Sequence, residues 1–247
     1  MSILTRALRL LEAYSLERPE LGITELSRAL GLPKSTVHRI VAELQAAGYL
    51  RQSSRTGKYR LSPRLWELGS VAVASFELRE AARPYLEALS LGTRETINLV
   101  VLDEADALYV DEIQGRQPVR AHSYVGTRAP AHCVATGKAI LAWTAGALDR
   151  REELGLVRFT PHTIVDRVEL ERELKVVREQ GYAVNREEWR ADICAVAAPV
   201  RDHTNRVVAA LGVSGPAHRL SRERLRELGL VASDTAGRLS RELGYRP

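Results

Sequence analysis

The sequence predicts an α+β fold in two parts, a small and mainly helical part at the N-terminus and a larger part that mixes strands and helices. Three observations support this division. Apolar residues recur at helical spacing through residues 1–48, and two short alternating segments around a glycine follow them. From Thr96 onward, β-rich runs such as TINLVVL and LYVDEI are interspersed with amphipathic helical segments. Charge is also distributed unevenly between the two parts.

The positive charge of the chain is confined to its N-terminal part. The net charge is +5, and residues 1–61 contain ten Lys or Arg against five acidic residues, which accounts for the whole excess. The remaining residues carry 26 bases and 26 acids. A basic end joined to a neutral partner is the charge pattern of a module that binds a polyanion such as nucleic acid. A basic surface that serves only solubility has the same composition, so charge alone leaves both interpretations open.

The apolar pattern of the N-terminal part predicts three helices. The first helix ends before Pro19, and its apolar stripe comprises Leu4, Ala7, Leu8 and Leu11. Thr24 is the expected N-cap of a short second helix, and Gly31 is expected to end it. Pro33 suits the first turn of the third helix, which ends at Gly48. Two short helices joined by a tight turn with a glycine are typical of a helix-turn-helix.

The exposed face of the third helix carries small or cationic hydrogen-bonding side chains. A recognition helix reads base edges with its N-terminal residues, and its first amides favour a nearby phosphate. We expect Arg39 to form a bidentate contact with guanine, worth about 1–3 kcal/mol of discrimination against a wrong base. The alternative is an ordinary three-helix unit whose polar face is simply solvated. The candidate DNA contacts on the helices are Thr24, Lys34, Ser35, Thr36, His38 and Arg39.

Two short alternating segments after the third helix predict a β-hairpin. They are Tyr49–Arg51 and Lys58–Leu61, with the turn at Thr56–Gly57. Arg55 and Lys58 are expected at the tip of this hairpin and complete the candidate DNA contacts. A helix-turn-helix followed by a basic hairpin is a winged arrangement, in which the tip cations lie over the adjacent DNA backbone or minor groove.

This N-terminal segment resembles the DNA-binding domain of IclR-type bacterial transcriptional regulators. The strings GLPKSTVHRIVAEL and GKYRLSPRLWELG are both similar to family sequence. The resemblance implies a winged helix-turn-helix domain over residues 1–62 and a linker helix over residues 63–78, a region that helps to pair the subunits. One winged helix reads one half-site. We therefore expect a homodimer, or a dimer of dimers (homotetramer), on a palindromic operator in double-stranded DNA.

Strand and helix patterns alternate in the remaining residues, 79–247. Helical spacing continues through the linker and past it, to Leu89. Strands are predicted at 96–102, 108–113, 119–125, 195–200 and 206–213. Helices are predicted from 137 to 143, from 168 to 179 and from about 221 to 243. Antiparallel strands flanked by helices predict an α+β sensor domain of the GAF-like kind.

Four strings in this second part also resemble blocks of the IclR family in the expected order, so the resemblance covers nearly the full length. They are AHCVATGKAILA, GYAVNREEW, AVAAPV and ALGVSGP. One departure is Asp192, where family members usually carry a glycine in a loop that lines the effector pocket, and it leaves the ligand open. The resemblance implies a pocket lined by Ala135, Thr136, Asn185, Ile193, Ala195, Gly212 and Ser214, with Ala121 and Tyr124 nearby.

The expected effector is a small organic acid, either aromatic or a short keto acid. Backbone amides at Ala135 and Thr136, where a helix begins, favour an anion through the helix dipole. Ser214 and Asn185 are able to add hydrogen bonds to it. Each side chain also has a structural alternative, with Thr136 as a helix cap, Ser214 as a turn residue and Asn185 as a loop stabiliser.

Other site chemistries match the sequence less well, and neither catalysis nor a cofactor is expected. The Gly-Lys pair of ATGKAILA lacks the other residues of a P-loop, and GVSGP lacks the final glycine of a hydrolase elbow. The adjacent acids Glu187 and Glu188 are expected to be solvated. His132, Cys133 and Cys194 match no zinc-site spacing, so buried thiols are expected there in place of a metal.

The composition predicts a cytoplasmic protein. No apolar run approaches the roughly 18–20 residues of a membrane span, so no membrane association is expected. The N-terminal residues lack a secretory cleavage pattern. Two cysteines are too few for a disulfide framework and agree with a reducing compartment.

These features together predict a sequence-specific DNA-binding transcription regulator whose operator binding is modulated by a small organic acid. One alternative is a metabolite-binding protein or an enzyme with a helical N-terminus that does not read DNA. Another is a non-specific nucleoid binder, whose affinity would fall steeply with salt without any preferred sequence. The sequence leaves open whether the regulator represses or activates.

Overall fold

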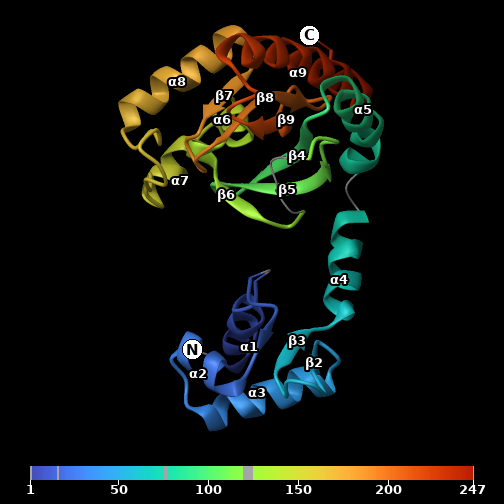
Figure 1. Cartoon of the computed structure of the whole chain (residues 1–247), viewed down its shortest axis with the longest axis vertical. Helices are drawn as coiled ribbons and strands as arrows, with labels where there is room; N and C mark the ends of the chain where they lie inside the picture. The colour runs from blue at the N-terminus through green and yellow to red at the C-terminus, as the bar shows by residue number, and fades with distance from the viewer. Residues whose placement is uncertain (1, 16, 75–76, 119–124, 247) are drawn as a thin grey trace. The chain divides into compact units, whose positions relative to one another are not determined.

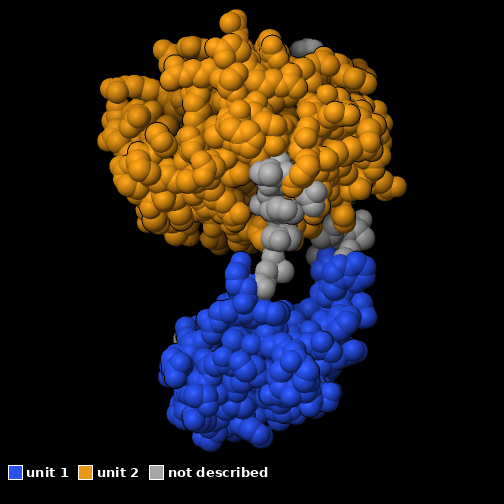
Figure 2. Space-filling view, viewed as in Figure 1, with its two compact units in different colours: residues 1–75 blue, residues 76–247 orange. Residues whose placement is uncertain are grey.

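A computed structural model of the chain describes residues 2–15, 17–74, 77–118 and 125–246. The chain divides into two compact units, Met1–Ser75 and Phe76–Pro247, which Figure 2 shows in separate colours. Unit 1 is helical with a small sheet, and unit 2 combines a larger sheet with helices (Figure 1). The predicted α+β class is confirmed. In the described ranges, no helix has the length and hydropathy that a membrane crossing requires.

Unit 1 is built around three helices, α1 (Ile3–Glu12), α2 (Ile23–Leu30) and α3 (Lys34–Ala46). Side chains from all three helices and from the hairpin share one core, which includes Leu10, Leu26, Val37, Ile40, Val41 and Leu50. The predicted stripe of α1 is partly wrong, because Leu10 is buried whereas Leu4 and Leu8 are 67% and 51% exposed. Leucines on two sides of this helix have helical spacing, so only packing against α2 and α3 selects the buried side.

The start of α2 also corrects a prediction. Thr24 lies within the first turn, because Gly22 occupies the N-cap position. The Gly22 amide donates a 2.7 Å hydrogen bond to Glu25 Oε2, so a carboxylate in the helix satisfies the amide that precedes it. Gly31 ends α2 with a φ of +65°, as predicted, and Pro33 is the N-cap residue of α3.

Three short antiparallel strands complete the winged fold. They are β1 (Glu20–Leu21), β2 (Leu50–Gln52) and β3 (Tyr59–Leu61), in the order β1-β3-β2. The predicted hairpin is confirmed as β2 and β3, whereas β1 is too short to produce an alternating pattern and was not predicted. Helix α4 (Pro63–Ala74) follows the hairpin within unit 1.

Unit 2 contains a six-stranded antiparallel sheet in the order β6-β5-β4-β9-β8-β7. Its strands are β4 (Thr96–Asp103), β5 (Asp106–Ile113), β6 (Arg128–Pro130), β7 (Ala183–Arg186), β8 (Ile193–Arg201) and β9 (Val207–Pro216). The strand predicted at 119–125 falls almost entirely outside the described residues, and Val125 itself lies in a turn. Strands β6 and β7 were not predicted, because both are short segments within loops of mixed composition.

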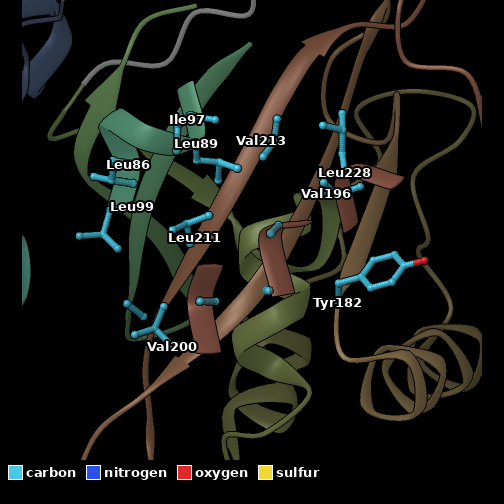
Figure 3. Packing of buried hydrophobic residues seen from close by; sticks show 14 of the residues in the cluster. Leu86, Leu89, Ile97, Leu99, Tyr182, Val196, Val200, Leu211, Val213 and Leu228 are labelled. Atoms are coloured by element: carbon cyan, nitrogen blue, oxygen red, sulfur yellow. The ribbon is translucent and has the colours of Figure 1, made fainter. Parts of the chain in front are cut away.

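The two faces of this sheet are covered differently. Helices α5 (Glu77–Thr93) and α9 (Arg222–Glu242) pack on one face over large aliphatic side chains such as Leu99, Leu211 and Val213 (Figure 3). The other face carries small residues, among them Ala197 and Ala210, and it packs against α6 (Ala135–Leu141) and α8 (Arg167–Gln180). Since strand side chains alternate, large and small residues separate onto opposite faces.

Two short helices complete the small-residue face of unit 2. A 3₁₀ turn (Ala131–Cys133) precedes α6, and α7 (Ala147–Glu153) follows it. Gly137 of α6 lies so close to this turn that an added Cβ would come within 2.3 Å of the Ala131 carbonyl oxygen. The chain therefore needs a glycine at this position to bring the 3₁₀ turn and α6 together.

Candidate functional site

The first half of α3 presents a polar surface beside its buried stripe. Lys34, Ser35, His38 and Arg39 are exposed and Thr36 is half-buried, whereas Val37, Ile40 and Val41 are buried. No described side chain caps the first amides of α3, because Pro33 stands at the N-cap. These amides and the exposed side chains form an electropositive, hydrogen-bonding surface suited to a phosphate backbone. Thr24 is also exposed, on the first turn of α2.

The two predicted wing cations lie in different places. Arg55 is exposed in the turn between β2 and β3, as predicted. Lys58, predicted at the tip, instead directly precedes β3, and its Nζ lies 3.0 Å from Glu25 Oε1. The Gly22 amide and Lys58 hold the pKa of Glu25 below its usual range. Lys58 therefore connects the start of β3 to α2, and Arg55 is the exposed cation of the turn.

Unit 2 contains a cavity of about 260 Å³ on the small-residue face of the sheet. All seven described residues that were predicted to line an effector pocket border this cavity: Ala135, Thr136, Asn185, Ile193, Ala195, Gly212 and Ser214. Ala121 and Tyr124 lie outside the described residues. The sequence prediction missed further lining residues, namely Asn98, Tyr109, Val134, Trp189, Arg190 and Val213.

Strand register explains why residues so distant in sequence meet at this cavity. Ser214 of β9 pairs with Ala195 of β8, which in turn pairs with Asn185 of β7. Asn98 of β4 is likewise aligned with Gly212 of β9. The missed Asn98 was accessible to sequence reasoning in principle, as a lone amide in the otherwise apolar run TINLVVL.

Small residues make room for the cavity and bring α6 close to the sheet. A Cβ on Gly212 would lie 2.7 Å from Thr136 Cγ2, so this glycine allows the close approach of α6. Thr136 does not cap α6, because the helix begins at Ala135 and Val134 is its N-cap. The Thr136 hydroxyl is buried and forms no well-aligned hydrogen bond with the described residues.

Three polar side chains on the sheet, those of Asn185, Ser214 and Asn98, form hydrogen bonds within the protein. Asn185 donates from Nδ2 to the Cys133 carbonyl at 3.2 Å and accepts from the Glu188 amide at 2.8 Å, so both ends of its amide are in use. Ser214 lies within β9 and not in a turn, and its Oγ is 3.1 Å from Asn98 Nδ2. The Ser214 hydroxyl also donates to the Thr96 carbonyl at 3.5 Å, so the bonding capacity left on Oγ is one lone pair.

A buried ion cluster supports the cavity wall and corrects one prediction. Lys138 is fully buried, and its Nζ lies 2.9 Å from Glu173 Oε1 and 2.8 Å from Glu188 Oε1. Glu188, predicted to be solvated, is also buried, and burial raises its pKa despite the opposing effect of Lys138. The signal available in the sequence was a lysine within the otherwise small and apolar helix ATGKAIL.

The loop between β7 and β8 forms the side of the cavity that carries charge. Trp189 and Arg190 both border the cavity, and the Arg190 guanidinium lies 4.5 Å from the centre of the Trp189 ring. Asp192 has a φ of +61°, a left-handed conformation that glycine adopts at less cost. Its side chain is exposed and Asp192 does not line the cavity, so the departure noted in the sequence leaves the described cavity surface unaltered.

The two cysteines near the cavity are buried thiols, as predicted. Both Cys133 and Cys194 are free and buried, and burial raises the pKa of Cys133 to about 12. Among the described residues, no three His, Cys, Asp or Glu side chains are arranged to hold a metal ion.

Both units of the chain are similar to known proteins. Residues 3–54 match the IclR helix-turn-helix domain, and residues 70–241 match the family described as bacterial transcriptional regulator IclR C-terminal. The HTH-type transcriptional regulator XynR of Escherichia coli (strain K12) is 38% identical over 249 residues, covering 97% of this chain and 96% of XynR. The HTH-type transcriptional regulator KdgR of the same organism is 36% identical, covering 99% of this chain and 94% of KdgR.

A solved structure matches over nearly the same length. An IclR homolog from Microbacterium hydrocarbonoxydans, complexed with 4-hydroxybenzoate, is 30% identical with a TM-score of 0.78 and covers 96% of this chain and 100% of that chain. The matched families and the full-length relatives are those of transcriptional regulators. Such regulators have a helix-turn-helix domain that binds DNA and a C-terminal domain that binds an effector. The chain therefore belongs to the IclR family of bacterial transcriptional regulators.

Proposed function

We propose that this regulator reads a palindromic operator through α3 and the wing of paired subunits, and that a small organic acid in the cavity of unit 2 changes its operator affinity. One observation carries the DNA-reading part. The first half of α3 exposes four polar side chains, Lys34, Ser35, His38 and Arg39, and no described contact gives them a structural task. Exposed side chains at the start of such a helix are the ones that reach base edges.

Individual roles follow from side-chain chemistry. Arg39 reads a guanine through two parallel hydrogen bonds. Lys34, Ser35 and Thr24 contact phosphates and set the position of the helix, while Thr36 and His38 lie at the base edges. Arg55 at the tip of the wing contacts the adjacent backbone or minor groove. Lys58 acts mainly through Glu25 by holding the wing against α2.

Pairing of subunits follows from the same geometry. A single winged helix reads only one half-site, and two linked heads gain affinity and specificity through effective concentration. We therefore assign the functional form as a dimer or a dimer of dimers.

The effector part rests on the cavity of about 260 Å³ and its mixed polar and apolar lining. This volume suits a ligand of one ring or a few carbons. The relative from Microbacterium hydrocarbonoxydans holds 4-hydroxybenzoate, an acid of that size. The seven predicted residues that border the cavity are the proposed effector contacts. Ligand binding changes the relative populations of head arrangements, with a coupling of about 1–3 kcal/mol that is typical of such regulators.

Substitution of Arg39 tests the DNA-reading function. The operator is first identified by selection from random duplexes with the purified full-length protein, and an inverted repeat is expected. Arg39→Ala should then weaken operator binding by about 10- to 100-fold, while binding to unrelated DNA changes far less. Arg226→Ala, which removes an exposed arginine from α9 in unit 2, is the charge-matched control and should leave operator affinity unchanged.

Two outcomes would exclude this function. Unchanged operator affinity of a folded Arg39→Ala protein would mean that α3 does not read DNA. Selection that yields no preferred sequence, together with a steep salt dependence, would identify a non-specific binder.

A further inference from the structure

The described lining of the cavity is electrically asymmetric. Arg190 is the one charged side chain among the described residues that border it, and it stands on the loop between β7 and β8, where it is exposed. Trp189 lies against its guanidinium at 4.5 Å and so supports the plane of the group. The positive charge also acts on the Tyr109 hydroxyl across the cavity, where it favours the ionised form. A ligand in the cavity therefore experiences the field of Arg190.

The region around Tyr109 and α6 disfavours negative charge. Burial raises the pKa of Tyr109 to about 12, against the smaller opposing effects of Thr136 and Arg190. The same loss of hydration that keeps Tyr109 neutral would penalise a ligand carboxylate placed beside it. The two amides at the start of α6, the other candidate partners for an anion, lie at this disfavoured end, because Thr136 is the neighbour of Tyr109.

Neutral hydrogen-bonding groups line the same region. Tyr109 borders the cavity. Ser214 Oγ accepts from Asn98 Nδ2 at 3.1 Å and donates to the Thr96 carbonyl at 3.5 Å, which leaves one lone pair on Oγ for a ligand hydroxyl. These groups recognise a hydroxyl or carbonyl oxygen without having to compensate a full charge.

We propose that the acid lies with its carboxylate at Arg190 and with a neutral oxygen-bearing end against Tyr109 and Ser214. The ligand class is then a small monocarboxylate with a hydroxyl or carbonyl group at the opposite end. Arg190 determines the preference for a charged ligand, and Tyr109 determines the preference for the second oxygen. This assignment rests on the proposed effector function of the cavity.

Matched ligands separate the two recognitions. The full-length protein is titrated with 4-hydroxybenzoate, 4-hydroxybenzamide and benzoate, and with 4-hydroxybutyrate, 4-hydroxybutyramide and butyrate. Within a triplet, the amide removes the negative charge and the third member removes the hydroxyl. Affinities are measured by calorimetry, with ligand-induced thermal stabilisation as the second readout. The hydroxylated acid should be the tightest member of at least one triplet.

Each variant removes one of the two proposed contacts, either the guanidinium that binds the carboxylate or the hydroxyl that binds the second oxygen. Arg190→Gln should weaken binding of the hydroxylated acid by about tenfold or more and leave binding of the amide almost unchanged. Tyr109→Phe should reduce the preference for the hydroxylated acid over its deoxy partner by about 3- to 10-fold, with the preference for acid over amide retained. Arg186→Gln removes an exposed arginine of β7 that does not border the cavity, and it should bind every ligand as the unchanged protein does.

The outcomes distinguish this inference from the function on which it rests. If the acids bind but Arg190→Gln loses no affinity for them, the carboxylate lies elsewhere and the proposed orientation is wrong. Equal affinity for hydroxylated and deoxy acids contradicts the assignment of Tyr109. If no acid of either triplet binds, both this orientation and the effector part of the proposed function are rejected, whereas the operator measurements still stand.

Discussion

The two units of this regulator place their candidate functional residues in opposite environments. In unit 1, Lys34, Ser35 and Arg39 project from α3 into solvent, and the fold of the unit depends on other side chains. In unit 2, Thr136 and Asn185 border the cavity and are almost fully buried, and Asn185 also closes two internal hydrogen bonds. Function and stability should therefore be separable in unit 1 and coupled in unit 2.

The difference follows from the size of the two ligands. DNA is larger than the domain that reads it, so contacts have to be made from an exposed surface. A small acid has to be surrounded in order to gain enough contacts, and the protein must bury polar groups to do so. A buried polar group lowers the stability of the fold unless it forms hydrogen bonds. In unit 2, side chains such as Asn185 already form hydrogen bonds within the protein.

The largest effect is expected at the buried ion cluster. Lys138→Met leaves the carboxylate of Glu188 buried without its cation, which should lower the free energy of unfolding by about 3–5 kcal/mol. Chemical denaturation of the full-length protein measures this loss. Adding Glu188→Gln to Lys138→Met should recover part of it, because the second substitution removes the unpaired charge.

Lys175→Met is the matched control for that prediction. Lys175 lies on α8 with a side chain that is 72% exposed, so its loss should change stability by less than about 0.5 kcal/mol. Equal effects of the two lysine substitutions would show that the Lys138 cluster does not stabilise unit 2.

A smaller effect, dependent on pH, is expected at His132. Its Nε2 is 3.1 Å from the Val157 carbonyl, and its buried Nδ1 lacks a hydrogen-bond partner among the described residues. Burial holds the pKa of His132 below its ordinary value of 6.5, so the unfolded chain takes up a proton before the folded chain does. This contribution to stability is present above pH 6.5 and is lost as the pH falls toward the folded pKa.

Thermal unfolding at several pH values checks this sign. The stability difference between the unchanged protein and His132→Gln should shrink as the pH falls below 6.5. A constant difference for His132→Gln would contradict the assignment of a buried neutral histidine.

The smallest effect on stability is expected in unit 1, where the effect on function should be clear. Lys34→Ala should change the free energy of unfolding by less than about 0.5 kcal/mol, because the side chain is exposed. Because Lys34 is proposed to contact a phosphate, its loss should reduce the magnitude of the slope of log operator affinity against log salt concentration by about one. Gln45→Ala, near the end of α3, is the control with no expected change in slope.

Two results would remove the contrast between the units. A loss of stability above about 1 kcal/mol in Lys34→Ala would show that the surface of α3 also has a structural role. An unchanged salt slope would show that Lys34 is not a phosphate contact.

Prediction from sequence succeeded where the structure depends on neighbours along the chain. The turn at Gly31, the buried stripe of Val37, Ile40 and Val41, and the hairpin after α3 all follow from local spacing and backbone preference. The predictions were wrong where the local sequence allows two structures equally well. Thr24 and Gly22 are both acceptable N-caps, and only the position of Glu25 relative to Gly22 and Lys58 distinguishes them.

In unit 2, similarity of sequence blocks identified seven lining residues that share one cavity, but the way in which they meet was not visible in the sequence. Asn98 and Tyr109 were missed, because a lone amide or aromatic residue is conspicuous in an apolar strand but does not show which face of the sheet it occupies. Their positions depend on the pairing of β4 with β5 and with β9, and the β4–β9 pairing joins residues more than one hundred positions apart.

Local sequence is sufficient to predict the fold class of this protein, its division of charge, its winged helices and its family, because these properties reside in short segments whose chemistry is local. The packing of distant segments decides which leucines of α1 are buried, that Lys58 connects the wing to α2, and that Lys138 meets Glu188 across fifty residues. It also decides that Arg190 faces the cavity. Burial and pairing depend on which distant segments pack together, and no local pattern carries that information.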